Sequence, residues 1–294
     1  MIVIGASASN GVDEKLASLL NVELIKVHHK IFPDGESYVR IPKSLKGADV
    51  VIVQSTYPPQ DKHLIDALIT VDAAYNAGAN RVILAIPYLA YARQDRMFIS
   101  GEGVSIKVVL KAIKASGVYG LIVVDLHKEE SLKFFNGKCV NVTAIPELAE
   151  YIKSIISPDK SMVLAPDIGA LERAKMFALE AGISEWSYLR KTRDKVTGEI
   201  TFEPVEIDAH GKTVIIVDDI ISTGGTVVKG SKIMYEQGAR EVYAVCTHPL
   251  LVGNALDKLF KAGVKDVVAT DSIPSRVSKV SVAKAIARGI ESLW

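Results

Sequence analysis

Short apolar runs rich in β-branched residues alternate with amphipathic stretches along almost the whole chain. The runs are predicted to be strands, at residues 1–4, 22–27, 50–54, 82–86, 121–125, 162–165, 214–218, 242–246 and 267–270. The helices predicted between them include residues 62–77, 105–116, 170–181, 226–237 and 254–262. Because the runs are continuously apolar, they are typical of parallel strands that helices cover on both faces. The alternation predicts an α/β fold built on mostly parallel sheets flanked by helices.

Repeated helix ends indicate a duplicated architecture. Gly78, Gly238 and Gly263 each follow an amphipathic stretch and precede a strand by a few residues, which is typical of a helix stop. Since the first two lie about half the chain apart, we infer two similarly built halves.

The length agrees with this division. With 294 residues and about 150 residues per domain, we predict an N-terminal domain over residues 1–144 and a C-terminal domain over residues 145–278. We predict that residues 279–294 form a terminal strand and helix, for which the N-terminal domain is the expected packing surface.

The charge balance excludes several partners. The chain carries 35 basic and 34 acidic residues, a net charge of +1, so it has no electrostatic footprint for nucleic acid or an anionic membrane surface. Its longest apolar stretch, residues 82–92, contains Pro87 and is too short to span a bilayer. Two distant cysteines, Cys139 and Cys246, fit a reducing compartment better than a disulfide framework. We therefore expect a cytoplasmic protein, with neither nucleic acid nor membrane as a partner.

The most specific signal lies at the end of one predicted strand. Residues 213–226 read Thr-Val-Ile-Ile-Val-Asp-Asp-Ile-Ile-Ser-Thr-Gly-Gly-Thr, so Asp218 and Asp219 follow an apolar run at the sheet edge where ligands bind in open α/β folds. The turn after them supplies backbone N–H groups, hydroxyls and a positive helix terminus, which together suit a phosphate. Because two carboxylates would repel that phosphate, we expect them to face sugar hydroxyls or a phosphate-bound cation. A Gly-rich turn beside a solvated acid pair is the alternative, and it explains less of the string.

Three further groups of polar residues are ambiguous by themselves. The string from Phe32 to Glu36, Phe-Pro-Asp-Gly-Glu, also fits an ordinary turn before a strand. Arg93 and Arg96 follow a predicted strand and offer planar donors for phosphate oxygens, but they also fit a surface salt-bridge cluster. His127 ends another strand and is either a satisfied structural histidine or a metal ligand.

Taken in order, these motifs resemble those of a known family. The Asp-Asp turn resembles the phosphoribosyl-diphosphate motif of type I phosphoribosyltransferases. The other matching strings are Phe-Pro-Asp-Gly-Glu, Tyr-Ala-Arg-Gln-Asp (residues 91–95), Asp-Leu-His (125–127), Pro-Asp-Ile-Gly (166–169) and Arg-Lys-Thr-Arg (190–193). Together they are similar to the ribose-phosphate pyrophosphokinase (phosphoribosyl diphosphate synthase) family over nearly the full chain, and most similar to its archaeal branch.

The resemblance implies two similar phosphoribosyltransferase-like domains and a reaction. The enzyme would transfer the diphosphoryl group of ATP to the 1-hydroxyl of ribose 5-phosphate, giving 5-phosphoribosyl 1-diphosphate and AMP for nucleotide biosynthesis. ATP would be bound by Phe32, Asp34, Gly35, Glu36, Arg93, Gln94 and His127, with Phe32 stacking on adenine. Ribose 5-phosphate would be bound by Arg193, Asp218, Asp219, Ser222, Thr223, Gly224, Gly225 and Thr226.

Catalysis, metal and assembly follow from the same resemblance. Lys191 and Arg193 would be catalytic, and they lie in residues 187–206, a segment that breaks the alternation and is predicted to be a hairpin with its polar tip at residues 194–198. His127 and Asp167 would hold Mg²⁺, the expected cofactor. In the family the Phe32 turn reaches across a two-fold interface, so the expected partner is a second copy in at least a homodimer.

Two other functions remain open from the sequence. A phosphoribosyltransferase that consumes phosphoribosyl diphosphate would explain the Asp-Asp turn but not the motifs of the N-terminal half. A catalytically inactive regulatory paralogue of the synthase should lack loop or metal residues, whereas this chain keeps Lys191, Arg193, His127 and Asp167.

Overall fold

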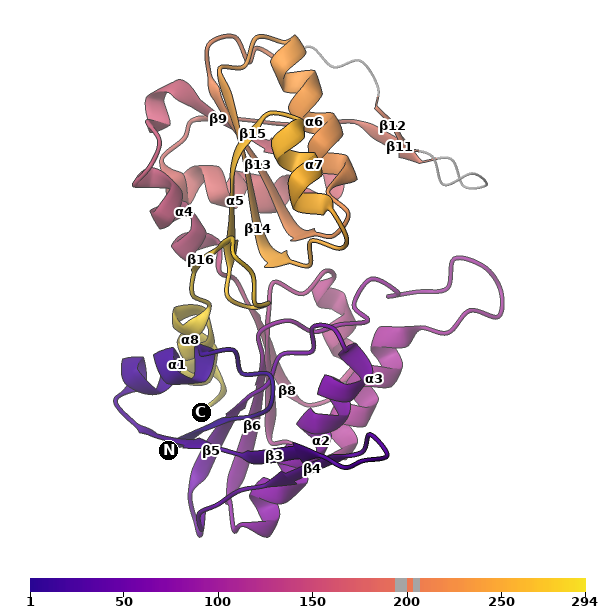
Figure 1. Ribbon diagram of the computed structural model, residues 1–294, viewed down its shortest axis with the longest axis vertical. Helices are drawn as coiled ribbons and strands as arrows, with labels where there is room; N and C mark the ends of the chain where they lie inside the picture. Colours follow the sequence, from indigo (N-terminus) through magenta and orange to yellow (C-terminus); the bar gives the residue numbers. More distant parts are fainter. Residues whose placement is uncertain (194–199, 203–206) are drawn as a thin grey trace. The chain divides into compact units, whose positions relative to one another are not determined.

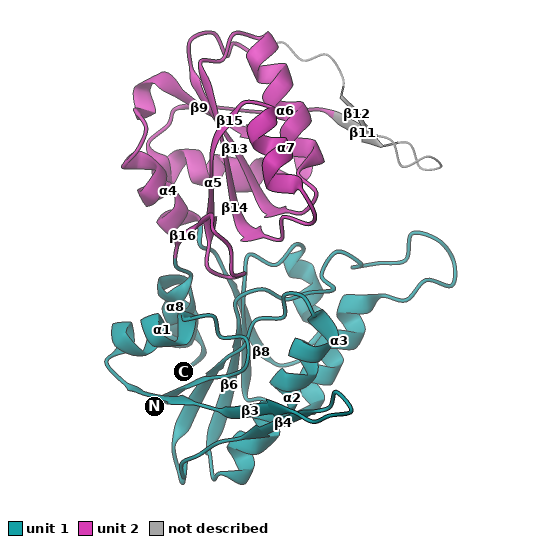
Figure 2. Cartoon of the chain, viewed as in Figure 1, with its two compact units in different colours: residues 1–144, 281–294 teal, residues 145–280 magenta. Residues whose placement is uncertain are grey.

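The chain divides into two compact units (Figure 2). The computed structural model describes residues 1–193, 200–202 and 207–294. Unit 1 is formed by Met1–Ala144 together with Ser281–Trp294, and unit 2 by Ile145–Val280. No helix in the described residues is long and apolar enough to cross a membrane.

Unit 1 is built on a six-stranded sheet in which every pair of neighbours is parallel. The strand order is β2-β1-β5-β6-β7-β8. The strands are β1 (Ile2–Gly5), β2 (Glu23–Lys26), β5 (Asp49–Val53), β6 (Arg81–Ile86), β7 (Gly120–Val124) and β8 (Lys138–Val142). The helices are α1 (Val12–Leu20), α2 (Gln60–Asn76), α3 (Ser105–Ala115) and α8 (Ala283–Leu293), with the short 3₁₀ helix η1 (Glu129–Phe134).

The two faces of this sheet are covered by different helices (Figure 1). Val50 and Ile52 face the core under α2 and α3, whereas Val51 and Val53 face the core under α1 and α8. Since successive side chains of a strand point to opposite faces, apolar residues throughout β5 fill both cores. A separate antiparallel hairpin, β3 (His28–Ile31) and β4 (Ser37–Arg40), lies outside the sheet.

Unit 2 repeats the plan. Its sheet has the order β10-β9-β13-β14-β15-β16, again with parallel neighbours. The strands are β9 (Ser161–Ala165), β10 (Glu185–Tyr188), β13 (Thr213–Ile221), β14 (Glu241–Pro249), β15 (Val264–Thr270) and β16 (Ser278–Val280). The helices are α4 (Ile145–Lys153), α5 (Leu171–Ala181), α6 (Gly225–Glu236) and α7 (Ala255–Lys261), with 3₁₀ turns η2 (Pro158–Lys160) and η3 (Ile168–Ala170). The helices α4 and α5 cover one face, and α6 and α7 the other.

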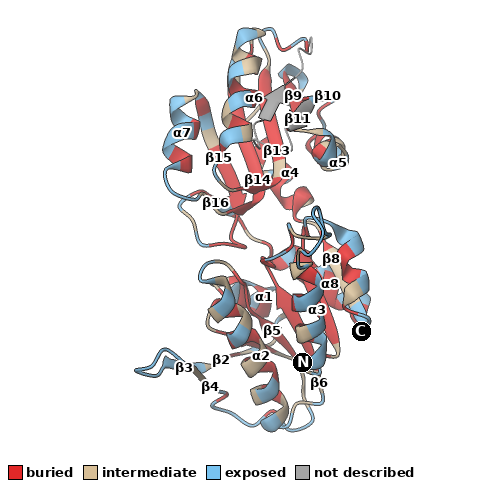
Figure 3. Ribbon diagram, turned by 90° about the vertical axis from the view of Figure 1, so that its right-hand side faces the viewer, coloured by how far each residue is buried: buried red, intermediate tan, exposed pale blue. Residues whose placement is uncertain are grey.

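Two similar units, each a parallel sheet flanked by helices, confirm the predicted fold class; the strand interiors are buried on both faces (Figure 3). The predicted hairpin at residues 187–206 contains the antiparallel pair β11 (Lys191–Arg193) and β12 (Ile200–Phe202). Its predicted tip, residues 194–198, lies outside the described residues. The terminal segment is divided: β16 joins the unit 2 sheet, whereas α8 packs in unit 1, where Ile286 and Ile290 enter the core.

Candidate active site

The carboxyl edge of the unit 2 sheet carries two adjacent carboxylates. Asp218 and Asp219 lie near the end of β13, which extends beyond the predicted end at residue 218 because Ile221 still pairs with Pro249 of β14. The backbone N–H of Asp219 donates to Asp218 Oδ1 at 2.9 Å, and Asp219 is buried. Burial, together with the neighbouring Asp219 charge, raises the pKa of Asp218 well above its usual range. The pair would be stabilised by hydroxyl donors or by a cation.

One cation near this pair was not predicted from the sequence. Arg173 of α5 places Nη2 3.8 Å from Asp219 Oδ2, and its side chain is largely buried. Its charge opposes the rise in the pKa of Asp218. The residue sits in a helix with an ordinary amphipathic pattern, so nothing in the sequence distinguished it from a solvated arginine.

The turn at residues 222–226 connects β13 to α6. Thr223 and Gly225 are exposed, and Ser222 and Thr226 are half-buried. Gly224 precedes α6 with φ 75°, in the left-handed region that favours glycine, and a Cβ there would lie 3.4 Å from Leu259. The turn therefore leads directly into the N-terminal end of α6, where backbone N–H groups and hydroxyls are available to an anion.

Asp167 lies at the same sheet edge. It follows β9, which pairs in parallel with β13: Leu164 lies opposite Ile216, two residues before Asp218, so Asp167 follows β9 at the level of the acid pair. Asp167 is half-buried, and its Oδ1 accepts a hydrogen bond from Gly169 N at 2.9 Å at the start of η3. The edge strand β10 pairs with β9 and leads from there into β11. The side chains of Lys191 and Arg193 in β11 lie outside the described residues.

In unit 1, the loops after β5 and β6 are joined by hydrogen bonds at the carboxyl edge. Thr56 donates to the Tyr88 carbonyl from its backbone N at 2.9 Å and from Oγ1 at 2.8 Å, and the same Oγ1 accepts from Ala90 N at 2.8 Å. Ser55 Oγ accepts from Tyr88 N at 3.2 Å. These hydrogen bonds hold residues 88–90 against the loop after β5 and so fix the beginning of the segment that leads to Arg93.

The predicted nucleotide residues Arg93 and Gln94 follow that start. Arg93 is exposed and Gln94 is half-buried. Gln94 Nε2 donates to Glu102 Oε2 at 3.2 Å, and that carboxylate also accepts from Phe98 N at 2.7 Å and Ile99 N at 3.1 Å. Hydrogen bonds from these two backbone N–H groups lower the pKa of Glu102. Glu102 organises the loop beyond Gln94, a role that the sequence did not indicate.

At the end of β7, Asp125 and His127 differ in environment. Asp125 is buried with φ 42°, and its Oδ2 accepts from Ala144 N at 3.1 Å, which gives it a structural role. His127 is exposed. The two predicted metal residues, His127 and Asp167, belong to different units, and the described residues contain no cluster of three or more His, Cys, Asp or Glu side chains suited to a metal ion.

The remaining predicted nucleotide residues lie at the tip of the β3–β4 hairpin, which projects from the body of unit 1 (Figure 3). Phe32 N donates to the Glu36 carbonyl at 2.8 Å, Glu36 N donates to Asp34 Oδ1 at 3.1 Å, and Gly35 has φ 97°. Phe32 is 39% exposed, with Tyr38 packing edge-on at 5.9 Å between ring centroids. Lys30 Nζ lies over the same ring, 4.8 Å from its centroid, so the tip is an ordered turn with a partly exposed aromatic ring.

The structure thus assembles the predicted residues in three places. Asp167, Asp218, Asp219 and the 222–226 turn share the carboxyl edge of unit 2. Arg93, Gln94 and His127 follow strands at the carboxyl edge of unit 1. Phe32, Asp34, Gly35 and Glu36 stand apart on the hairpin.

Known proteins share this architecture and sequence. The N-terminal domain of ribose phosphate pyrophosphokinase matches residues 1–117, and the phosphoribosyl synthetase-associated domain matches residues 185–293. The ribose-phosphate pyrophosphokinase of Sulfurisphaera tokodaii is 47% identical over 99% of this chain and 100% of its own length. The chain belongs to the ribose-phosphate pyrophosphokinase family.

Two further members of the family are similar to this chain over nearly its full length. The ribose-phosphate pyrophosphokinase of Methanopyrus kandleri is 43% identical over 100% of this chain and 99% of its own. The crystal structure of phosphoribosylpyrophosphate synthetase from Mycobacterium smegmatis has a TM-score of 0.88 and 28% identity, covering 99% of this chain and 98% of that one. The chain is therefore an enzyme with the family's function, the formation of phosphoribosyl diphosphate from ATP and ribose 5-phosphate.

Proposed function

We propose that the carboxyl edge of unit 2 binds ribose 5-phosphate and that the unit 1 residues bind ATP. The observation that carries the first assignment is the acid pair, half-buried Asp218 and buried Asp219, shortly before the partly exposed 222–226 turn that leads into α6. Two carboxylates accept hydrogen bonds from the 2- and 3-hydroxyls of the sugar. Ser222, Thr223, Gly224, Gly225 and Thr226 hold the 5-phosphate with backbone N–H groups and hydroxyls.

ATP is assigned to two unit 1 segments. The hairpin tip contributes Phe32, which stacks on adenine, with Asp34, Gly35 and Glu36 at the polar edge of the base. Arg93, Gln94 and His127 hold the ribose and phosphates. The half-exposed Phe32 ring and the exposed Arg93 guanidinium support these roles, because both are available to a ligand.

The donor set at His127 and Asp167 fits a divalent cation. Mg²⁺ prefers oxygen ligands and retains several waters, so it needs few protein groups. Asp167 supplies a half-buried carboxylate and His127 an exposed imidazole, two donor types that suit a hydrated divalent ion. We assign Mg²⁺ to these residues, where it would neutralise phosphate charge and so favour the approach of the two anionic substrates.

The chemistry follows from orientation and charge. The acid pair and the turn hold the sugar so that its 1-hydroxyl faces the β-phosphorus of ATP. Attack forms the bond between that hydroxyl oxygen and the β-phosphorus and breaks the bond from the β-phosphorus to the α,β-bridging oxygen, which leaves on AMP, while the hydroxyl proton is released to water. Lys191 and Arg193 stabilise the charge that develops on the transferred group. We assign no general base, since positioning and electrostatic stabilisation carry phosphoryl transfer.

The active species is proposed to be a homodimer, in which the Phe32 turn of one chain serves the site of its partner. An isologous dimer would contain two such composite sites. The near-neutral charge and reduced cysteines support a cytoplasmic location.

The test is an assay of the purified protein with ATP, Mg²⁺ and ribose 5-phosphate, with nucleotides followed by chromatography and the sugar product by ³¹P NMR. We expect stoichiometric AMP and 5-phosphoribosyl 1-diphosphate. ADP with a 1-monophosphate would contradict diphosphoryl transfer. Turnover that requires a nucleobase and phosphoribosyl diphosphate would identify a phosphoribosyltransferase, and no turnover at all would favour an inactive paralogue.

A further inference from the structure

The β3–β4 hairpin has no hydrophobic core of its own. Its strands pair with each other in a separate two-stranded sheet, and none of residues 28–40 is fully buried. An isolated two-stranded hairpin is marginally stable in water, so contacts with the body of unit 1 must determine its position. Those contacts decide where the tip with Phe32 and Glu36 lies.

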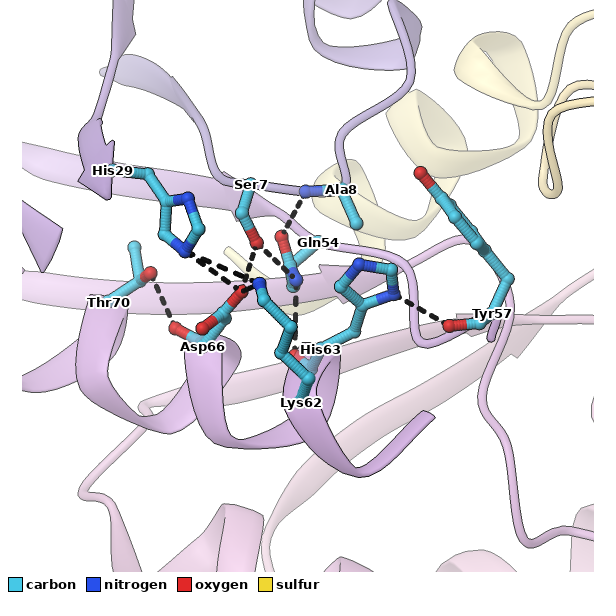
Figure 4. Close-up of polar contacts among 9 residues, drawn as sticks. All are labelled: Ser7, Ala8, His29, Gln54, Tyr57, Lys62, His63, Asp66 and Thr70. Carbon is cyan, nitrogen blue, oxygen red and sulfur yellow. Dashed lines mark hydrogen bonds and ion pairs between the residues drawn. The ribbon is translucent and has the colours of Figure 1, made fainter. Parts of the chain in front are cut away.

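A buried carboxylate on α2 lies beneath the hairpin (Figure 4). Asp66 is 0% exposed, and its Oδ2 accepts hydrogen bonds from Ser7 Oγ at 2.6 Å and Lys62 Nζ at 2.7 Å. His29 Nε2 of β3 lies 3.3 Å from the same oxygen and 3.4 Å from Lys62 Nζ. The β1 loop, α2 and β3 therefore meet at one oxygen atom.

The second strand of the hairpin interacts with the same group. Burial raises the pKa of Asp66, but interactions with Lys62, Ser37 and Ser7 outweigh it, so the pKa lies below its usual range. Ser37 is the first residue of β4 and pairs with Ile31 at the end of β3. His29 and Ser37 stand on opposite strands just below the tip. His29 makes the direct contact at 3.3 Å, whereas Ser37 is close enough to favour the ionised carboxylate, whose buried Oδ1 has no hydrogen-bond partner within the described residues.

The network behind Asp66 is itself fixed by the sheet. Gln54, which directly follows β5, accepts from Ala8 N at 2.8 Å and donates to Ser7 Oγ at 3.2 Å and to the His63 carbonyl at 3.1 Å. Gln54 is 0% exposed. Ser7 and α2 are thus held against the sheet, and Asp66 is a rigid anchor rather than a mobile surface carboxylate.

We propose that Asp66 is a positioning residue for nucleotide binding. Through His29 and Ser37, Asp66 holds the β3–β4 hairpin against α2, and we call this set of contacts the lock. The inference rests on the proposed role of the hairpin tip in binding ATP. Without the lock, the hairpin samples orientations in which Phe32, Asp34 and Glu36 do not meet the nucleotide. The apparent affinity for ATP then falls by the fraction of time that the hairpin is correctly placed.

The test compares Asp66→Asn with Asp72→Asn in the full-length protein. Asp72 is an exposed aspartate on the same helix whose Oδ2 accepts from Asn76, so it controls for charge and helix effects away from the hairpin. For Asp66→Asn we expect faster amide hydrogen exchange in residues 28–40 and a KM for ATP raised about tenfold, with the KM for ribose 5-phosphate within about twofold. Asp72→Asn should change none of these.

Two further variants guard against misfolding. His29→Gln and Ser37→Ala change half-buried hairpin positions and should reproduce the faster hydrogen exchange and the raised KM for ATP. In the double variant Ser37→Ala/Asp66→Asn, the change in free energy calculated from the KM for ATP should be smaller than the sum of the changes in the two single variants. Unchanged exchange over residues 28–40 in all three variants would overturn the lock. Equal rises in both KM values would overturn the positioning role, because a general loss of structure affects both substrates.

A separate variant distinguishes this inference from the proposed function. Asp34→Ala with Glu36→Ala removes the tip residues and leaves the lock intact. A normal KM for ATP in that variant would contradict the assignment of the tip to nucleotide and overturn the positioning role with it. Hydrogen exchange in Asp66→Asn reports on the lock alone and is read independently of that result.

Discussion

At the level of single residues, the acid pair makes an unfavourable electrostatic interaction in the unliganded protein. Asp218 is half-buried, Asp219 is buried, and the two adjacent side chains have like charge. The Arg173 guanidinium offsets this repulsion weakly, because its Nη2 lies 3.8 Å from Asp219 Oδ2. Burial and the Asp219 charge raise the pKa of Asp218, so ionised Asp218 destabilises the unliganded fold. A sugar with two vicinal hydroxyl donors would relieve that cost on binding.

The first prediction is that Asp218→Asn stabilises the unliganded protein at neutral pH. A carboxyl whose pKa is raised on folding favours the fold below its unfolded pKa, and this contribution is lost as pH rises through the folded value. We expect a gain of about 1 kcal/mol at pH 7.5, seen as about 2–4 °C in Tm, that shrinks as the pH is lowered. Calorimetric scans from pH 5 to 8 measure it; a difference that grows toward low pH would contradict the account.

The second prediction concerns ligand binding by the same pair. Asp218→Asn with Asp219→Asn should weaken ribose 5-phosphate binding at least tenfold, because a hydrogen bond to a charged group contributes about 1.5–3 kcal/mol. Binding of a non-hydrolysable ATP analogue should stay unchanged, which is the control. Isothermal calorimetry with ribose 5-phosphate and 2-deoxyribose 5-phosphate provides the measurement. Equal affinities of the native protein for both sugars would count against carboxylates on the vicinal hydroxyls.

At the scale of elements, the 222–226 turn depends on one backbone conformation. Gly224 has φ 75°, whereas Gly225 is the first residue of α6, and a Cβ on Gly225 would meet only Thr223 Oγ1, at 3.8 Å. The two adjacent glycines therefore differ in what they tolerate. A left-handed conformation costs a non-glycine residue about 1–3 kcal/mol.

The third prediction uses this difference. Gly224→Ala should lower the free energy of unfolding by about 1–3 kcal/mol, while Gly225→Ala, at a neighbouring site without that strain, should lower it by less than about 1 kcal/mol. Urea unfolding followed by circular dichroism gives both values. Similar losses in the two variants would show that the conformation of residue 224 is not what fixes the turn.

The fourth prediction belongs to the β11–β12 hairpin. Lys191→Ala should lower kcat by several orders of magnitude and leave the affinities for ATP and ribose 5-phosphate within a few-fold, because a charge that acts in the transition state contributes little to ground-state binding. Steady-state kinetics with both substrates measures the split. Near-normal kcat with a raised KM would assign Lys191 to substrate binding instead.

The elements also show what the sequence can reveal. Central strands such as β5, β6 and β7 are largely continuous apolar runs, so the sequence predicts them close to their observed positions. The edge strands β8 and β10 were not predicted, because their residues are mostly exposed or half-buried and lack that pattern. The acid pair was recognised as a local string. Arg173 and Asp66 were not, since their importance arises from neighbours distant in sequence.

At the scale of the whole molecule, the chain crosses between the two units twice. It leaves unit 1 after Ala144 and returns at Ser281, so that α8 completes a core started by α1 and β1. Gly289 of α8 packs so closely that a Cβ would lie 2.9 Å from Ile122 of β7. From the sequence we predict one terminal segment, residues 279–294, that packs on the N-terminal domain. In the structure only α8 belongs to unit 1, whereas β16 pairs in the unit 2 sheet, and the sequence pattern of a short strand followed by a helix does not reveal this division.

We propose that each active site needs the β3–β4 hairpin of one chain and the β11–β12 hairpin of its partner. A complementation experiment between two inactive variants tests this claim. One chain carries Asp34→Ala and Glu36→Ala and the other Lys191→Ala, and each should be nearly inactive alone. Mixed equally with subunit exchange confirmed by mass spectrometry, about half the dimers are heterodimers with one intact site of two, so activity should recover to about a quarter of the native level. A mixture that exchanges subunits and stays as inactive as its parents would contradict the claim.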